Sequence, residues 1–340
     1  MWNRRGRLPE GDWVVADRVH VTEHGFSIKD THGMPFVPFY GFVQEPRRFP
    51  VTRVSGGRRP VVAVLDTGVD PAHPWFQGDP GDPVLIDAYD EGWARPPVAD
   101  YGTHHGTFVA GLVRQHAPDA LILSVTLDRD NAGHIASGQI LAALDYLYEQ
   151  QPSFIDVICL AIGFHSLPTD DSYKAQVRAA VDRLAERGTV LVAAAGNFGT
   201  SQPVYPAAFA SELALVASVG AVTAERKLAD FSPSAPWVTR YCLGVDVVSA
   251  TPLTHGGGLS TLGDMAVHGR HLQQPLTGYG IGSGTSFAAA AYAGMLAKAL
   301  LDESAGVAAF DTTTARERAE RVLNDLTTPA PLELQDRETA

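Results

Sequence analysis

The sequence has few cysteines, no long apolar run and no excess of positive charge, and each absence excludes a class of protein. Two cysteines, Cys159 and Cys242, occur among 340 residues, too few for the disulfide framework of a small secreted domain. A disulfide between these two remains open. No run reaches the roughly 18 consecutive apolar residues that a membrane-spanning helix needs. The net charge of −12 argues against nucleic acid or an anionic membrane as a partner.

The amino-terminal residues also lack a targeting signal. The segment MWNRRGRLPEGDW carries positive charge but is not followed by the apolar stretch of a secretory signal. A chain that begins here is expected in the cytoplasm, although a secreted protein trimmed of its signal would look the same. What the chain does contain is 45% hydrophobic and 19% charged residues, which is typical of a globular protein with a well-packed core.

Residues 1–57 differ in pattern from the rest of the chain. Short alternating runs at 19–28 and 34–43, broken by His-Gly pairs, indicate hairpin strands. We therefore predict a small β-rich extension with a regulatory or docking role. Because it is too short and too rich in proline and glycine to be stable alone, it must pack on the larger domain or on a partner. We expect it to pack away from the active site.

Residues 58–310 alternate short apolar runs with longer helical stretches. Strands are predicted over 61–66, 84–87, 121–127, 156–162, 189–195 and 213–220. Helices are predicted over 105–115, 137–150, 171–187 and 286–302. This alternation indicates an α/β fold with a doubly wound, mostly parallel sheet flanked by helices. Residues 250–282 have no clear periodicity and predict a long loop, and 311–340 predict a C-terminal helix and tail.

Four polar side chains fall at the ends of these elements, where ligands bind in an open α/β sheet. They are Asp66 at the end of a strand, His105 at a loop-to-helix junction, Asn197 after a strand, and Ser286 at the start of an Ala-rich helix. Each alone has an ordinary explanation as a turn or helix-capping residue. Together, in the order Asp, His, Asn, Ser, they match one mechanism that needs a carboxylate, an imidazole, an amide and a hydroxyl.

The segments that carry these residues resemble the subtilisin family of serine proteases over about residues 60–305. They are DTG (66–68), HGTFVAG (105–111), AAAGN (193–197) and GTSFA (284–288). The resemblance implies a subtilisin-like serine endopeptidase that needs no cofactor. It implies that Ser286 attacks a peptide carbonyl, that His105 transfers the proton, and that Asp66 orients the imidazole. The Asn197 amide and the Ser286 backbone N–H would bind the oxyanion.

The same resemblance implies the substrate-binding residues. Gly133, His134 and Ile135 would form an edge strand that pairs with an extended peptide. The walls of the primary specificity pocket would be Ala161, Ile162, Gly163, Ala194, Ala195 and Gly196. Simple packing of the sheet is the alternative explanation for all nine residues. The family's matching Tyr-Pro bond is cis, so Tyr205-Pro206 is a candidate cis peptide.

The chain also departs from the family. His104 stands where glycine is usual, and we assign the base to His105 because Gly-Thr follows it. The stretch after the first helix lacks the insertion that forms a calcium loop in secreted relatives, and the 60 residues before the first strand are too few for a long propeptide. Both departures favour an intracellular protein. His255, His268 and His271 have no accompanying cysteine or acidic ligand, so no zinc site is predicted.

Three functions follow from the sequence. The leading one is a cytoplasmic endopeptidase that processes a particular protein or peptide, with a regulatory partner acting through the extension. The second is a catalytically silent binding or scaffold protein, against which the four intact polar residues argue. The third is a trimmed, secreted digestive protease, against which the missing calcium loop and the scarce cysteines argue. The natural substrate does not follow from the sequence.

Overall fold

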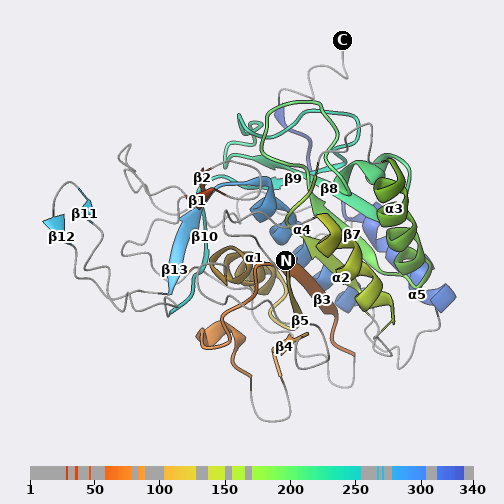
Figure 1. The fold of residues 1–340 in the computed structure, drawn as a ribbon, viewed down its shortest axis with the longest axis horizontal. Coiled ribbons are helices and arrows are strands. Elements are labelled where there is room, and N and C mark those ends of the chain that lie inside the picture. Colours follow the sequence, from red (N-terminus) through yellow and green to blue (C-terminus); the bar gives the residue numbers. More distant parts are fainter. Residues whose placement is uncertain are drawn as a thin grey trace.

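The centre of the fold is a parallel sheet with helices on both faces (Figure 1). A computed structural model of the protein describes residues 28–29, 35–36, 46, 58–78, 83–88, 103–127, 137–149, 155–164, 171–253, 266–267, 270–271, 278–303 and 312–332. Seven of the described strands join in the order β4-β5-β3-β6-β7-β8-β9. Their bounds are β3 (Val61–Asp66), β4 (Leu85–Asp87), β5 (Leu121–Thr126), β6 (Val157–Leu160), β7 (Val190–Ala194), β8 (Val216–Val222) and β9 (Arg240–Leu243).

Every ladder of this sheet is parallel, which confirms the predicted fold class. The six strands expected from the sequence are present, with ends shifted by a few residues. The seventh, β9, escaped prediction because it begins with Arg240 and lacks a continuous apolar run. It joins the sheet through tertiary pairing with β8.

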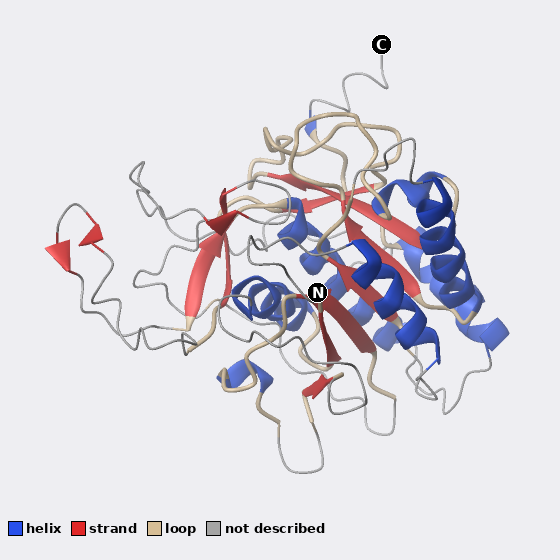
Figure 2. Ribbon diagram, in the orientation of Figure 1, coloured by secondary structure: helices blue, strands red, loops and turns tan. Residues whose placement is uncertain are grey.

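Two layers of helices cover the sheet (Figure 2). One face packs against α1 (Thr103–His116), α4 (Thr285–Glu303) and α5 (Thr312–Asp325), and the other against α2 (Ser137–Glu149) and α3 (Asp171–Glu186). Successive residues of β3 alternate between the layers: Val62 and Val64 join the first core cluster, Ala63 and Leu65 the second. Because both faces of the sheet are buried, the sequences of the central strands are uninterrupted runs of apolar residues.

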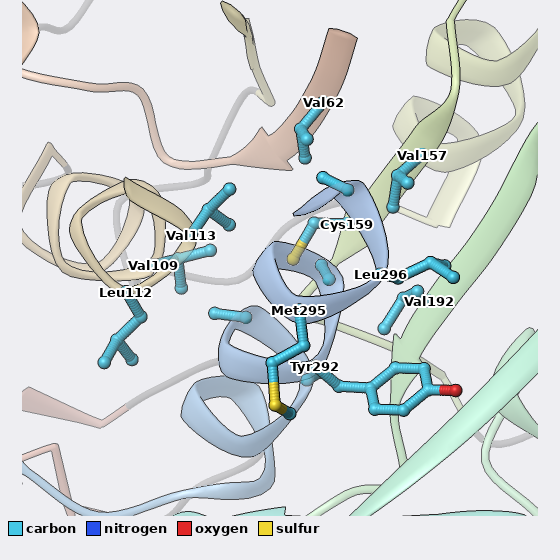
Figure 3. Close-up of a cluster of buried hydrophobic side chains, with 14 of the residues drawn as sticks. Val62, Val109, Leu112, Val113, Val157, Cys159, Val192, Tyr292, Met295 and Leu296 are labelled. Atoms are coloured by element: carbon cyan, nitrogen blue, oxygen red, sulfur yellow. The ribbon is translucent and has the colours of Figure 1, made fainter. Parts of the chain in front are cut away.

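Helix α4 lies at the centre of the larger cluster. Figure 3 shows its side chains Tyr292, Met295 and Leu296 beside strand residues such as Cys159, with α1 on the other side. A Cβ on Gly294 would lie 2.7 Å from the backbone oxygen of Val113. The small residues of α4 therefore let it approach α1 closely, and they explain its Ala-rich sequence.

The region predicted as a loop over 250–282 contains strands, so that prediction was wrong in part. β10 (Val247–Ala250) pairs antiparallel with β13 (Tyr279–Gly282), and β11 (Ala266–Val267) pairs with β12 (Arg270–His271). The sequence of β13, YGIG, has too few β-branched residues to signal a strand. Its partner β10 holds it extended.

The amino-terminal extension shows one strand pair. β1 (Ile28–Lys29) pairs antiparallel with β2 (Pro35–Phe36), which agrees with a hairpin at this point of the sequence. Pro46 is buried. The rest of the predicted runs at 19–28 and 34–43 lies outside the described residues, and the division of the chain at residues 57 and 310 stays a prediction.

The C-terminal helix α5 joins the main core. Ala319 and Val322 belong to the same cluster as α4, and Gly188, at the end of α3, has a φ of 83°. A Cβ there would lie 2.6 Å from the backbone carbon of Ala315, so glycine suits both the turn and the close approach of α5. Two short 3-10 helices, η1 (Pro74–Phe76) and η2 (Ala207–Ser211), complete the described elements.

The two cysteines are both free and buried, so the disulfide that the sequence left open does not form. Burial raises the pKa of both thiols, which makes them inert packing residues. Among the helices of the described ranges, none has the length and apolar character to cross a bilayer.

Candidate functional site

Several of the predicted site residues lie at the carboxyl edge of the sheet, where the strand order reverses. β3 lies between β5 and β6. The chain that leaves β3 therefore forms strands first on one side of β3 and later on the other. Such a switch point leaves a crevice beyond the strand ends, and it is where open α/β sheets bind ligands. Asp66 is the last residue of β3, Ala161 follows β6, and Asn197 follows β7.

The buried Asp66 pairs with the partly exposed His105. Asp66 is 1% exposed, and each of its carboxylate oxygens lies 2.9 Å from Nδ1 of His105. The backbone N–H of Thr67 donates to Asp66 Oδ1 at 2.7 Å, and Thr67 Oγ1 accepts from the Gly106 N–H at 3.0 Å. A Cβ on Gly106 would lie 2.3 Å from the oxygen of Gly68. The DTG and HGT segments therefore interlock, with glycine required where the backbones touch.

This pairing selects one form of the imidazole. An ionised carboxylate only accepts hydrogen bonds, so the bond to Asp66 puts a proton on Nδ1 of His105. Nε2 is then the basic nitrogen of the neutral ring. A histidine held in this way can take a proton at Nε2 while the carboxylate stabilises the resulting cation.

Ser286 lies beside this pair, in the first turn of α4. Its side chain is 4% exposed, and its hydroxyl donates to the Ala161 carbonyl oxygen at 2.7 Å. The ring of His105 packs 5.5 Å from that of Phe287, which in turn stacks on Phe108 at 4.4 Å. The carbonyl oxygen just after β6 therefore faces the start of α4. A distance of about 2.6–3.2 Å between His105 Nε2 and Ser286 Oγ stays a prediction.

The Asn197 side chain is oriented by Thr285. Its Oδ1 accepts from the backbone N–H of Thr285 at 2.8 Å and from Thr285 Oγ1 at 3.0 Å. Thr285 Oγ1 also accepts from the Gly196 N–H at 3.0 Å. With Oδ1 engaged, the Nδ2 end of the amide lies toward Gly284, 3.6 Å from where a Cβ would sit. The sequence pattern did not assign a role to Thr285, although it lies within the GTSFA segment.

The six predicted pocket-wall residues continue two neighbouring strands. β6 and β7 run side by side, with Leu160 opposite Ala193, so the segments 161–163 and 194–196 leave the sheet together. Tyr205-Pro206 is a cis peptide, as predicted, and Tyr205 pairs with Phe164, directly after the first segment. Gly133, His134 and Ile135 lie outside the described residues, and their role stays a prediction.

Two buried residues after β3 form a second set of contacts that the sequence pattern did not predict. Asp70 Oδ2 accepts from the Leu253 N–H at 2.9 Å, and His73 Nε2 lies 2.9 Å from the Gly278 oxygen. The Trp75 N–H donates to His73 Nδ1, so the proton of the neutral ring is on Nε2. These contacts tie the loop after Asp66 to both ends of segment 254–277. The histidines considered for zinc have no described side chains.

Comparisons with known proteins identify relatives of this chain. The model of the Subtilase family matches residues 57–322. The thermophilic serine proteinase of Bacillus sp. (strain AK1) is 34% identical over 208 residues, 58% of this chain and 47% of that protein. The major intracellular serine protease of Bacillus subtilis (strain 168) is 30% identical over 230 residues, 62% and 66% of the two chains. The chain thus matches about half to two thirds of the length of these relatives.

A solved structure shows the same fold. A cold-adapted subtilisin-like serine proteinase superposes with a TM-score of 0.55 at 21% identity, over 80% of this chain and 86% of that one. The family model covers well over half of the chain and includes every element that carries Asp66, His105, Asn197 and Ser286. The chain therefore belongs to the subtilase family.

Proposed function

We propose that this protein is a serine endopeptidase that hydrolyses peptide bonds with Asp66, His105 and Ser286 as its triad. The observation that carries the proposal is the hydrogen bond of the buried Asp66 carboxylate to Nδ1 of His105. It lies at the sheet edge where Ser286 begins α4. A buried carboxylate, an imidazole and a hydroxyl in this order are the parts of an activated nucleophile.

The proposed reaction begins when Ser286 turns its hydroxyl from the Ala161 carbonyl toward His105. Nε2 takes the hydroxyl proton as Oγ attacks the peptide carbonyl carbon, and Asp66 stabilises the imidazolium that forms. His105 then gives this proton to the leaving amine, and an acyl-enzyme remains on Ser286. A water molecule, deprotonated by His105, hydrolyses the acyl-enzyme and restores the serine.

Asn197 and the backbone N–H of Ser286 would stabilise the oxyanion of each tetrahedral intermediate. The amide is suited to this because Thr285 holds Oδ1 with two hydrogen bonds and leaves Nδ2 as the donor end. A donor that is already oriented needs no reorganisation when the negative charge develops, which is why such groups lower the barrier effectively.

The test uses a fluorophosphonate probe, which reacts only with an activated serine. The wild-type protein should label stoichiometrically and cleave members of a peptide library, whereas Ser286→Ala should lose labelling and about 10⁶-fold in turnover, the magnitude known for subtilisin itself. Ser283→Ala is the matched control, because Ser283 lies three residues earlier and its hydroxyl contacts Asp246 rather than the site. A wild-type protein that neither labels nor cleaves would favour the silent scaffold.

We further propose that the enzyme acts in the cytoplasm on a particular protein or peptide. The name of the B. subtilis relative, an intracellular serine protease, supports this location. Cell fractionation with an antibody to the chain tests it, and recovery of the protein outside the cell would contradict it.

Residues 1–57 are proposed to be a docking or regulatory element that a partner recognises. Where the extension meets the domain, Arg59 donates to the oxygens of Asp119 and Pro83, at the amino edge of the sheet and opposite Asp66. The chain thus enters the catalytic domain on the side opposite Asp66, and we propose that the extension packs on that side. Deletion of residues 1–57 should leave turnover of a small peptide unchanged or lower. A higher turnover would identify the extension as an inhibitor.

A further inference from the structure

The first turn of α1 carries His105 and is bonded to the loop that follows β3. The Gly106 N–H donates to Thr67 Oγ1 at 3.0 Å, and the Asp70 N–H donates to Thr107 Oγ1 at 2.9 Å. The N–H groups of a first helical turn have no acceptor within the helix, so outside contacts determine where this turn lies. The two bonds run in opposite directions and together hold the turn against the loop.

The bond between Asp70 and Thr107 is buried. Thr107 is 0% exposed and Asp70 is 7% exposed. Without the hydroxyl, the Asp70 N–H would lose its acceptor in a place that water does not reach, and an unmet donor of this kind is costly. The loop would therefore shift to find another acceptor. Because the loop begins at Asp66, such a shift would move the carboxylate that contacts His105.

The carboxylate of Asp70 connects this contact to a third element. Oδ1 accepts from the Ala72 N–H and Oδ2 from the Leu253 N–H, both at 2.9 Å. Leu253 lies three residues after β10, and β10 packs on α1, where Ser249 Oγ donates to the Phe108 oxygen at 2.7 Å. The loop, the helix and the strand thus form a closed set of contacts, in which Asp70 is bonded to the other two.

We propose that Thr107 and Asp70 are positioning residues, which hold His105 at the distance from Asp66 that proton transfer requires. The proposal rests on the endopeptidase function proposed above. Each oxygen of Asp66 lies 2.9 Å from His105 Nδ1. Because N–H···O hydrogen bonds span only about 2.7–3.2 Å, a small displacement of the loop from α1 would weaken this pair. Thr107 and Asp70 would act through the pair and not on the substrate itself.

The first test removes the hydroxyl of Thr107 without changing the charge. Thr107→Val should lower kcat on a small peptide on the order of 10-fold and leave KM near its wild-type value, since a misplacement of about 1 Å can cost 10²-fold in rate. The acidic limb of the kcat/KM pH profile should move about 0.5 pH unit lower, because a displaced carboxylate stabilises the imidazolium less. Thr107→Ser keeps the hydroxyl and should restore most of the turnover and the position of the limb.

Asp70→Asn gives a second, independent measurement. An amide offers one acceptor oxygen in place of two, so it cannot accept from both the Ala72 and the Leu253 N–H groups. The value of kcat should fall by a smaller factor than in Thr107→Val, again with KM near the wild-type value. Only turnover is compared for this variant, because the loss of a charge would itself move the pH profile.

Thr189→Val is the control for the loss of a buried hydroxyl. Thr189 is 4% exposed, and its Oγ1 donates to the Ile155 oxygen at 2.8 Å, at the amino edge of the sheet. This variant should be less stable in urea, but it should keep the wild-type kcat per active site, counted by fluorophosphonate labelling, and the wild-type pH profile. An equal fall of kcat in this control would overturn the positioning role.

The same role is wrong if Thr107→Val keeps the wild-type kcat per labelled site, or if its kcat falls while the acidic limb does not move. Should that variant fail to fold, an unchanged kcat in Asp70→Asn overturns the role. Absence of any cleavage and labelling in the wild type would instead overturn the endopeptidase function itself.

Discussion

Two buried aspartates at opposite edges of the same sheet have different partners. Asp66 and Asp156 are each 1% exposed, and each lies at the end of a central strand. Asp66 ends β3 at the carboxyl edge and contacts His105. Asp156 precedes β6 at the amino edge and contacts two arginines.

The Asp156 cluster joins three parts of the chain. Arg58 Nη1 lies 3.0 and 2.9 Å from the two carboxylate oxygens, and Arg318 Nη2 lies 2.9 Å from Oδ1. The Val61 N–H donates to Oδ2 at 2.8 Å. The carboxylate thus links the start of β6 to the segment before β3 and to helix α5.

The partner determines what a buried carboxylate can do. A guanidinium keeps its proton throughout the range in which proteins fold, so the arginine pairs of Asp156 can only hold structure. An imidazole gains and loses a proton near neutral pH, so the pair of Asp66 can transfer one. Asp156 therefore stabilises the fold at the amino edge of the sheet. In the proposed function, the equally buried Asp66 takes part in catalysis at the carboxyl edge.

The largest expected effect comes from Asp66→Asn. An amide at this position favours the wrong tautomer of His105, so turnover should fall about 10⁴-fold, as the equivalent change does in another triad protease. The free energy of unfolding should change far less than in the Asp156 variant. Peptide turnover and urea denaturation measure the two effects. A variant with normal turnover would remove Asp66 from the mechanism.

Asp156→Asn should show the opposite pattern. Removal of the charge breaks the ion pairs of Asp156 with both arginines, and breaking a buried pair such as that with Arg318 costs about 3–5 kcal/mol of unfolding free energy. Turnover per titrated active site should stay near the wild-type value. Urea denaturation checks the first effect, and labelled-site counting the second.

Asp145→Asn is the matched control for Asp156. Asp145 pairs with Arg183 on the surface, where the two side chains are 40% and 46% exposed. Such pairs contribute about 0–1 kcal/mol. If both aspartate variants lose the same unfolding free energy, the Asp156 cluster does not stabilise the fold more than a surface ion pair does.

Asn197→Ala tests a neutral side chain at the same carboxyl edge of the sheet as Asp66. Turnover should fall about 10²- to 10³-fold with little change in KM, because the amide acts on charge that develops only in the transition state; this magnitude comes from subtilisin. Thr285→Val should cause a smaller loss by releasing Oδ1. Unchanged turnover in the Asn197 variant would place the oxyanion donors elsewhere.

The smallest effect concerns His116, at the far end of the helix that carries His105. Burial lowers its pKa to about 4, below the ordinary 6.5, so the folded state favours the neutral ring. The unfolded chain binds the proton first as the pH falls, and stability is lost between about pH 6.5 and 4. We expect about 1–2 kcal/mol less stability at pH 5 than at pH 7 from this group.

His116→Gln removes this titration. Urea denaturation at the two pH values should show a smaller difference for the variant than for the wild type. An identical pH dependence in both proteins would mean that other groups account for the acid sensitivity of the fold.

The central sheet and the order of the polar residues could be predicted from the amino-acid sequence. β3, β6, β7 and β8 are continuous apolar runs because both faces of the sheet are buried there, and that requirement is visible in the local sequence. The ends of these strands differ from the predicted ones by up to three residues, because an apolar run does not mark where the backbone pairing stops. The segments of Asp66, His105, Asn197 and Ser286 could therefore be assigned to one edge of the sheet from the order of strands and helices alone.

The contacts that join distant segments could not be predicted from the local sequence. β9 and β13 have weak local signals and exist through their partners. Asp156 meets Arg318 from 162 positions away, and Asp70 meets Leu253 from 183 away. Val204 lies against Gly163 and Gly196 only because the fold brings their segments together. A sequence displays periodicity over neighbouring residues, whereas side chains far apart in the chain become neighbours only when the sheet has formed between them.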